Sequence, residues 1–245
     1  MLRSLQQKKF RQKYEFFIAE GPKICAEALS SGSLEIVEIF ALPSWLDSNT
    51  VLVQNYRSIV TVVSEKELKK ISTLKTPNLV LILAKLPDLT VNHSLITKGT
   101  HLFCDGIQDP GNLGTIIRIS DWFGVSSIIL NEGCVDPYNP KTIQATMGSF
   151  MRVPLSIVKD SHEKVFSSFD HIYGAAMEGE DLYESHLEET ALFVIGNESK
   201  GISGKVRDKC SQLISIPKSK TAGAESLNAA VATGIILGEL HRQKM

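Results

Sequence analysis

Three segments of this 245-residue chain combine glycines with polar side chains that could bind or activate a ligand. The first runs from Asp105 to Arg118 with the sequence DGIQDPGNLGTIIR. Its glycines allow the backbone to approach a ligand closely, but it contains neither the G-x-G-x-x-G of dinucleotide-binding turns nor the Gly-Lys-Ser/Thr of P-loops. If a helix begins near Asn112, its free amides suit a phosphate. We interpret this segment as a candidate anion site, with Arg118 two turns along the helix.

Arg118 is flanked by the apolar residues Ile116, Ile117 and Ile119. One interpretation is structural: the arginine extends from a buried helix to water, or pairs with Asp121. The other places it at the mouth of a ligand crevice. The residues alone leave both interpretations open.

The second segment is FVIGNESKGIS, in which an apolar run ends at Ile195 and is followed by Gly196, Asn197 and Glu198. Gly196 allows the chain to bend at the end of a strand. A plain connection between two elements explains the glycines, but it explains the amide and the carboxylate less well. We therefore count this turn as a second candidate for ligand binding.

The third segment, ISIPKSKTAGAESLNAA, leads into the C-terminal helix. Pro217 ends a strand, residues 218–225 are expected to be flexible, and Ser226 is suited to cap the helix. In that helix Ala230, Gly234 and Gly238 form a stripe of small residues. Each helical glycine costs about 1 kcal/mol, so close packing against the core or a second subunit must compensate.

Strands and helices alternate around these segments in the second half of the chain. This order predicts an α/β fold with a parallel sheet covered on both faces, and such sheets bind ligands outside the carboxyl ends of their strands. The expected strands are 102–104, 125–130, 172–176, 192–195 and 213–216, and the expected helices are 112–123, 141–149, 161–169 and 226–242.

The first half of the chain has shorter elements and predicts a small α/β domain. We expect strand-like segments at 16–18, 35–40, 58–63 and 79–84, helices at 23–30 and from residue 64, and a linker over 85–99. Residues 1–13 carry five positive charges and no negative one, at Arg3, Lys8, Lys9, Arg11 and Lys13. This basic run is either a solvated helix start or an arm that contacts RNA phosphates.

Composition excludes several classes of protein. The formal net charge is -1, so the composition alone does not indicate a nucleic-acid-binding protein. The four cysteines are too far apart for a zinc or redox motif, and we expect them to be reduced and no metal to be bound. The most apolar late segment, 227–240, is shorter than the ~20 residues of a membrane span. No signal peptide is evident, so we expect a cytoplasmic protein that does not enter a membrane.

The order and spacing of the three segments resemble the three motifs of the SpoU (TrmH-like) RNA 2′-O-methyltransferases. The matching residues are Asn112 and Arg118, then Gly196, Asn197, Glu198 and Gly201, then Ile216 and Pro217 with Ser226, Leu227 and Asn228. The start of the chain, with its basic run and the sequence Ala19–Lys23, is similar to the small RNA-substrate-binding domain of many members. The third motif departs from the family, because Lys218 replaces the usual Met and the path to Ser226 is longer.

The resemblance implies the architecture. It predicts an RNA-substrate-binding domain at 1–90 and a SpoU methyltransferase domain at 100–245, whose parallel-sheet fold ends in a C-terminal trefoil knot (SPOUT-like). Such a knot is an exception among folds. The family also implies a homodimer with the terminal helix near the interface.

The resemblance also implies a cofactor and a substrate, S-adenosyl-L-methionine and a structured rRNA or tRNA. The cofactor would be held by Ile195, Gly196, Asn197, Ile216 and Leu227.

The implied reaction is transfer of a methyl group to a ribose 2′-hydroxyl. Because the methyl donor is already activated, the enzyme mainly positions and deprotonates the hydroxyl. Arg118 would contact the hydroxyl or an adjacent phosphate and promote deprotonation, Asn112 would orient the nucleotide, and Glu198, Ser226 and Asn228 would support the catalytic site. Arginine normally stays protonated, so a role as general base would need an unusual environment.

Two alternatives remain for comparison. One is a catalytically inactive RNA-binding or ribosome-assembly protein of the same fold, against which the joint presence of Asn112, Arg118 and Glu198 argues. The other is a nucleotide-dependent oxidoreductase, against which the missing dinucleotide fingerprint argues.

Overall fold

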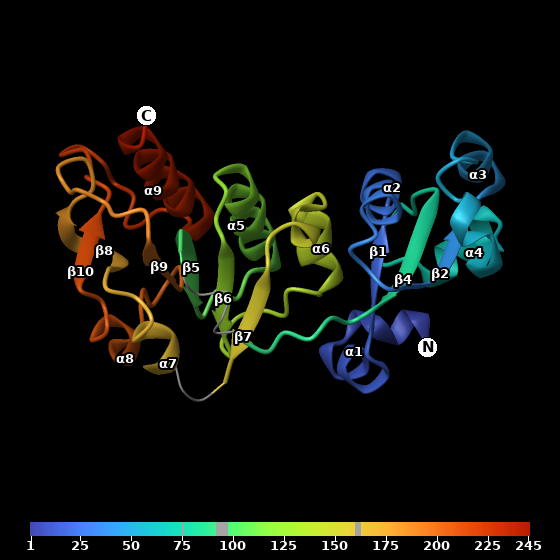
Figure 1. Ribbon diagram of the computed structural model, residues 1–245, viewed down its shortest axis with the longest axis horizontal. Coiled ribbons are helices and arrows are strands. Elements are labelled where there is room, and N and C mark those ends of the chain that lie inside the picture. Colours follow the sequence, from blue (N-terminus) through green and yellow to red (C-terminus); the bar gives the residue numbers. More distant parts are fainter. Residues whose placement is uncertain (75, 92–97, 160–162) are drawn as a thin grey trace. The chain divides into compact units, whose positions relative to one another are not determined.

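The computed structural model describes residues 1–74, 76–91, 98–159 and 163–245. The chain forms two compact units, whose elements are labelled in Figure 1. Unit 1 comprises Met1–Asp88 and Asp136–Met151, and unit 2 comprises Leu89–Val135 and Arg152–Met245. The expected linker at 85–99 contains the break between Asp88 and Leu89, whereas its residues 92–97 lie outside the described residues. The segment Asp136–Met151 differs from the sequence prediction, which placed it in the C-terminal domain.

Unit 1 is built on a four-stranded sheet with the order β1-β4-β2-β3. β4 pairs antiparallel with β1 and β2, and β2 pairs parallel with β3. The strands are β1 (Phe16–Glu20), β2 (Ile36–Ala41), β3 (Val60–Val62) and β4 (Val80–Lys85). The helices are α1 (Lys8–Tyr14), α2 (Pro22–Ser31), α3 (Pro43–Ser48), α4 (Glu65–Ile71) and α6 (Pro140–Thr146), with 3-10 helices η1 (Leu2–Gln6), η2 (Gln54–Ile59) and η4 (Ser149–Met151).

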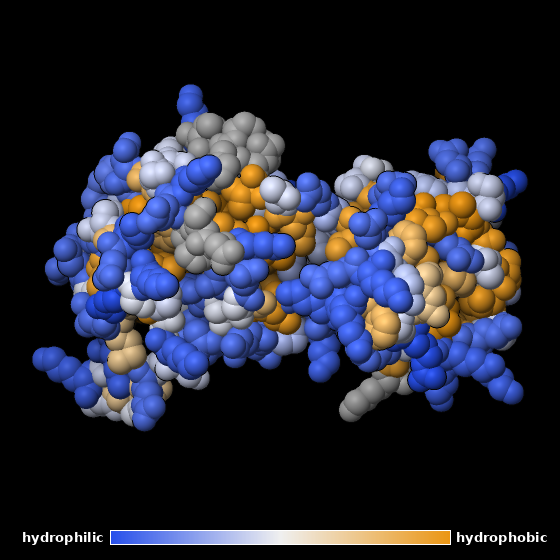
Figure 2. All heavy atoms as spheres, turned by 90° about the horizontal axis from the view of Figure 1, so that it is seen from below, coloured by the Kyte–Doolittle hydropathy of each residue, from blue (hydrophilic) through white to orange (hydrophobic). Residues whose placement is uncertain are grey.

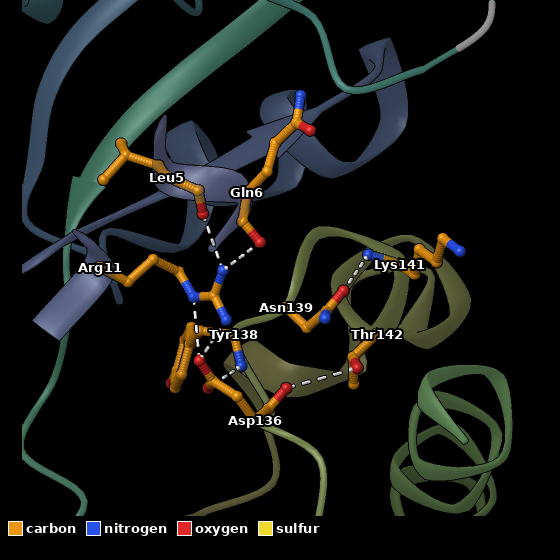
Figure 3. Close-up of polar contacts among 8 residues, drawn as sticks. All are labelled: Leu5, Gln6, Arg11, Asp136, Tyr138, Asn139, Lys141 and Thr142. Atoms are coloured by element: carbon orange, nitrogen blue, oxygen red, sulfur yellow. Dashed lines mark hydrogen bonds and ion pairs between the residues drawn. The ribbon is translucent and has the colours of Figure 1, made fainter. Parts of the chain in front are cut away.

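Arg11 on α1 connects the segment Asp136–Met151 to the rest of unit 1 (Figure 3). Its side chain is 1% exposed and donates to Leu5 O at 2.7 Å, Gln6 O at 3.0 Å and, through Nε, the Asp136 carboxylate at 2.9 Å. In the sequence, Arg11 belongs to the basic run of residues 1–13, for which the two interpretations are a solvated helix start and an arm that contacts RNA phosphates. Both interpretations are wrong for this residue, because buried acceptors occupy its guanidinium.

Aromatic rings also connect β1 to the segment Asp136–Met151, which we call the inserted segment. Phe17 packs edge-on against Tyr138 and Phe150, with ring centroids 4.7 and 6.0 Å away. The Gln144 side-chain amide donates to Glu20 O at 2.7 Å. Because Phe17 is fully buried, the segment Asp136–Met151 covers part of the core of unit 1.

Unit 2 contains a six-stranded sheet with the order β10-β8-β9-β5-β6-β7, and every neighbouring pair is parallel. The predicted α/β fold with a parallel sheet is therefore confirmed. The strands are β5 (Thr100–Asp105), β6 (Ser127–Asn131), β7 (Leu155–Val158), β8 (Ile172–Asp181), β9 (Ala191–Gly196) and β10 (Gln212–Ser215). The helices are α5 (Pro110–Trp122), α7 (Glu163–Phe166), α8 (Gly204–Arg207) and α9 (Ala229–Gln243).

Two helices of unit 2 start elsewhere than predicted. α5 begins at Pro110 rather than Asn112, because the Asp109 carboxylate caps it and proline suits a first helical position. α9 begins at Ala229 rather than Ser226. The side chain of Asn228 caps α9 by accepting the N–H groups of Ala230 and Val231 at 2.9 and 3.2 Å, so the predicted capping role of Ser226 is wrong.

Other element boundaries also differ. α6 ends at Thr146 rather than near 149, because Met147 and Gly148 adopt positive φ angles of 52° and 101°. α7 is described only over Glu163–Phe166, and residues 161 and 162 of the predicted helix lie outside the described residues. The sequence does not predict β7, a four-residue strand too short to show a periodic pattern.

α5 and α9 pack against each other along the predicted stripe of small residues. A Cβ atom at Gly234 would lie 3.6 Å from Ile119 Cδ1, and one at Gly238 would lie 3.8 Å from Phe123 Cζ. The partner of this stripe within the chain is α5, but the distances are those of ordinary van der Waals contact and do not require glycine.

The surface carries no single dominant patch on the face drawn in Figure 2. Hydrophilic residues are spread over both units and are interrupted by hydrophobic areas. Among the described residues no helix is long and apolar enough to cross a membrane.

Candidate functional site

The candidate site lies where β5, β6 and β9 end. These strands are neighbours in the parallel sheet, so the loops after their carboxyl ends meet, as is usual for ligand sites of such sheets. The first and second sequence segments follow β5 and β9 directly, and the third follows β10.

Asp105, the last residue of β5, anchors these loops. It is 4% exposed, and its carboxylate accepts the Ser203 N–H at 2.6 Å and the side-chain amide of Asn131. Asn131 in turn accepts the N–H groups of Gly106 and Gly133 at 3.0 and 3.1 Å. A buried carboxylate needs such donors, so this network fixes the loops relative to each other.

Neither Asp105 nor Asn131 is predicted from the sequence to have a role. The available signal was a charged or amide residue directly after an apolar strand, at the edge where parallel sheets bind ligands. The side chains of both residues form hydrogen bonds that hold the loops in place.

The turn after β9 is held by reciprocal backbone hydrogen bonds. Asn197 and Gly201 exchange N–H···O bonds of 3.0 and 2.9 Å. The Asn197 side chain donates to Gly106 O at 2.8 Å and accepts from Ser199 N–H and Lys200 N–H at 3.0 and 3.1 Å. Asn197 therefore joins the first and second loops.

Gly196 is required by this turn. A Cβ atom there would lie 2.4 Å from the carbonyl carbon of Gly201 and the nitrogen of Ile202. No side chain fits at that distance, so the predicted bend at Gly196 has a steric cause. The close approach is to the chain itself.

A chain of side-chain hydrogen bonds brings residues of all three segments together. The Asn112 amide donates to Glu198 Oε1, and the Asn228 amide donates to Asn112 Oδ1 at 2.8 Å. Asn112 lies in the first turn of α5 and Asn228 caps α9, so the starts of both helices meet at the turn after β9. We call Glu198, Asn112 and Asn228 the polar triad.

Arg118 lies outside the polar triad. Six residues are about one and two-thirds helical turns, so Arg118 points to a different side of α5 than Asn112. Its side chain is exposed and has no hydrogen bond or ion pair with another described residue. The alternative pairing with Asp121 is wrong, because Asp121 binds Arg152 bidentately at 2.6 to 3.0 Å.

The remaining candidates differ in exposure. Ile195 is buried in β9 at 2%, whereas Leu227 is 46% exposed and Ser226 is also exposed. Ile216 is half-buried directly after β10. The segment 216–228 that contains three of them packs little against the rest of the unit, since nearly all its residues are exposed.

The thiols near the site are not nucleophiles. Burial raises the pKa of Cys134 to about 11, and burial also raises the pKa of Cys104 well above its ordinary value. Cys134 Sγ donates to Cys104 O at 3.1 Å. Both thiols are therefore protonated at neutral pH, and among the described residues no cluster of His, Cys, Asp and Glu could hold a metal ion.

Comparison with known proteins identifies related families. A family model described as the SpoU rRNA Methylase family matches residues 99–238, and one described as the MRM3-like substrate binding domain matches residues 1–82. A Bacillus subtilis relative named 23S rRNA (guanosine(2553)-2′-O)-methyltransferase RlmP is 29% identical, over 97% of this chain and 93% of the relative.

Solved structures resemble the full length of the chain. A structure described as a putative RNA methyltransferase of the TrmH family from Porphyromonas gingivalis is 32% identical, with a TM-score of 0.85 over 99% of this chain and 96% of the other. An AdoMet-bound rRNA methyltransferase from Sinorhizobium meliloti is 27% identical, with a TM-score of 0.84 over 100% and 94% of the two chains.

Proposed function

The chain belongs to the SpoU rRNA methylase family, and from this premise we propose that it transfers a methyl group from S-adenosylmethionine to a ribose 2′-hydroxyl of rRNA or tRNA. The observation that carries this proposal is the polar triad. Its members are up to 116 positions apart in sequence, yet they form one hydrogen-bonded chain at the carboxyl edge of the sheet.

The loops after β9 and β10 fit S-adenosylmethionine. Within the described residues, the backbone N–H groups of 216–228 make few hydrogen bonds, such as Ala222 N–H to Ser219 O at 3.0 Å. Their amides and carbonyls are therefore available to a ligand with many polar atoms. The exposed Leu227 side chain offers an apolar face for the adenine. We assign cofactor binding to Ile195, Gly196, Asn197, Ile216 and Leu227.

The bound cofactor supplies a methyl group on a sulfonium, and the protein residues position the acceptor. Asn112 and Glu198 orient the ribose, since an amide and a carboxylate can together donate to and accept from a hydroxyl. Asn228 holds Asn112 in place, and Ser226 lies two residues before it. Arg118 stabilises the developing oxyanion or an adjacent phosphate.

The proposal includes a second copy of the chain. Trp122 is 85% exposed at the end of α5, on the same side as Arg118, and Val231 on α9 is 50% exposed. Large exposed apolar side chains are typical of interfaces. A homodimer through α5 and α9 would cover them.

Two further features belong to the proposal. The similarity to TrmH-family structures over the full chain supports a trefoil knot formed by the loops after β9 and β10. All four cysteines are free, as is usual in the reducing cytoplasm, where we place the enzyme.

The test is methyl transfer from labelled S-adenosylmethionine to total RNA that lacks the modification, followed by digestion and identification of the labelled nucleoside. We expect a 2′-O-methylated nucleoside. Label on a base would refute ribose chemistry. Cofactor binding without any transfer would support the inactive RNA-binding or ribosome-assembly alternative.

A further inference from the structure

We propose that a face of α1 formed by Lys9, Phe10, Lys13 and Tyr14 binds an unpaired RNA nucleotide, whose base stacks on the rings while the lysines contact neighbouring phosphates. We call these four residues the α1 face. The inference rests on the proposed function, because the nucleotide belongs to the RNA that the enzyme methylates. It assigns particular contacts to unit 1, whose residues 1–82 match a substrate-binding domain.

The two rings of the α1 face are stacked, and we call this aromatic pair the platform. Phe10 and Tyr14 are four residues apart on the helix, and their rings are nearly parallel, with an interplanar angle of 11° and centroids 6.1 Å apart. Both residues are half-buried, and Tyr14 also packs against the hydrophobic core of unit 1, which holds its ring in place. Bases of every type stack on such rings, because each base has a π-face.

The ammonium groups of the two lysines lie over the rings of the platform. Lys9 Nζ lies 4.9 Å from the Phe10 ring centroid, and Lys13 Nζ lies 5.5 Å from that of Tyr14. Neither lysine forms an ion pair with another described residue. A base that stacks on the rings displaces the ammonium groups toward its own phosphates, so each charge exchanges a ring contact for a stronger ionic one.

The buried side of α1 explains why the platform keeps its orientation. A helix of seven residues is marginal by itself, but Arg11 ties this one to Leu5 O, Gln6 O and Asp136. Glu15 then ends the helix in a left-handed conformation, with φ of 58°. Because Arg11 points inward, Lys9 and Lys13 point outward, and the surface over α1 is mainly hydrophilic in Figure 2.

The chemistry of the α1 face favours unpaired RNA over a duplex. In an A-form duplex the bases are stacked on each other and their faces are covered, so only phosphates and 2′-hydroxyls remain for the lysines. The two rings therefore have no free base face on which to stack. Aromatic rings interleaved with cations are instead the usual combination for single strands.

The test measures binding of the full-length protein to a labelled single-stranded RNA of about 12 nucleotides, within the site sizes of single-strand binders, and to the matching duplex. Phe10→Leu keeps the apolar volume and removes the π-face. We expect its Kd for the single strand to rise at least about 5-fold, with S-adenosylmethionine binding and thermal stability unchanged. The matched control is Tyr56→Leu, at another half-buried aromatic residue of unit 1, with no expected effect on RNA binding.

The lysines are tested by salt dependence. Lys9→Gln and Lys13→Gln should each reduce the slope of log K against log salt by roughly 0.7, the value for one phosphate of a single strand. Lys209→Gln, at an exposed lysine of unit 2, is the control with the same change of charge. Wild-type affinity of Phe10→Leu, or an equal loss on the duplex, would overturn the proposal. Failure of methyl transfer with Phe10-dependent binding intact would refute only the proposed reaction.

Discussion

At the residue scale, the site separates side chains that hold the loops from side chains that are free to meet a substrate. Asp105, Asn131 and Asn197 use their polar atoms on neighbouring loops. Asn112 is bound on both sides within the polar triad, whereas Arg118 is exposed and without a partner among the described residues. An uncommitted cation can bind a phosphate or an oxyanion without first breaking an ion pair, and this supports its proposed role.

Replacing Arg118 by alanine should therefore abolish methyl transfer and leave folding and S-adenosylmethionine binding nearly unchanged. The reason is that no structural contact of Arg118 is lost. Activity is measured with labelled cofactor and binding by calorimetry, with Arg152→Ala as the control that breaks a surface pair. Loss of cofactor binding in Arg118→Ala would contradict this division of roles.

His101 offers a prediction about pH at the same scale. Its side chain is fully buried, Nδ1 lies 2.8 Å from Ser127 Oγ and Nε2 lies 3.1 Å from Lys98 O. Burial lowers the pKa of His101 below the ordinary 6.5, although the hydrogen bond to Lys98 opposes this. As the pH falls below 6.5, the unfolded chain takes up a proton that the folded protein resists, so the free energy of unfolding falls.

The measurement is urea unfolding between pH 7 and pH 5 of wild type and His101→Gln, which cannot titrate. We expect the stability of the wild type relative to the variant to decline over this range, by at most about 1.4 kcal/mol per pH unit. The exposed His186→Gln serves as the control. Parallel pH profiles of wild type and His101→Gln would show that the histidine is not resisting protonation.

At the element scale, the glycines of α9 and the glycine that ends β9 differ in the space around them. Gly234 and Gly238 let α9 approach α5, but an added Cβ would meet only ordinary contacts of 3.6 and 3.8 Å. Gly196 ends β9 where the backbone of Gly201 and Ile202 passes at 2.4 Å from the position of a Cβ. Helix packing therefore tolerates a methyl group that the turn after β9 does not.

The effect of alanine at these positions should differ in sign. Gly234→Ala is expected to stabilise unit 2 by up to about 1 kcal/mol, since alanine is the better helix former. Gly196→Ala should destabilise it by about 1–3 kcal/mol, as overpacking does, and should weaken S-adenosylmethionine binding. Chemical denaturation and calorimetry give both quantities, and a neutral Gly196→Ala would contradict the steric argument.

At the scale of the whole molecule, the chain passes from unit 1 to unit 2, returns to unit 1 and then enters unit 2 again. The segment Asp136–Met151 lies within the part that matches the SpoU family, yet it packs in unit 1. The core of unit 1 is therefore completed by residues that are distant in sequence, including Tyr138 and Phe150 against Phe17. Folding of unit 1 should depend on this inserted segment.

The Arg11–Asp136 pair measures that dependence. The two side chains are 1% and 10% exposed, and removing one partner of a buried pair commonly costs about 3–5 kcal/mol. We expect such a loss for Arg11→Met and for Asp136→Leu. The loss in the double variant should be smaller than the sum of the two single losses. A double-mutant cycle by urea unfolding gives the coupling. Single losses below about 1 kcal/mol would be those of a surface pair and would contradict the buried geometry.

The sequence by itself determined most strands of unit 2 and the loops that carry its motifs. Runs of apolar residues predicted most strands, and the order of Asn112, Glu198 and Asn228 predicted the family, because motifs of this kind depend on local spacing. Helix starts were less accurate. The caps at Asp109 and Asn228 are side-chain hydrogen bonds, and several neighbouring residues, such as Ser226, could have made them equally well.

Only the tertiary structure decided which distant residues meet. Asn112 and Glu198 are 86 positions apart, and Arg11 and Asp136 are 125 apart, and no periodicity relates such pairs. Charge alone made Arg11 look like Lys9 and Lys13. Burial separates them, because a guanidinium surrounded by carbonyl and carboxylate acceptors holds the fold together, whereas an ammonium left at the surface is available to a phosphate.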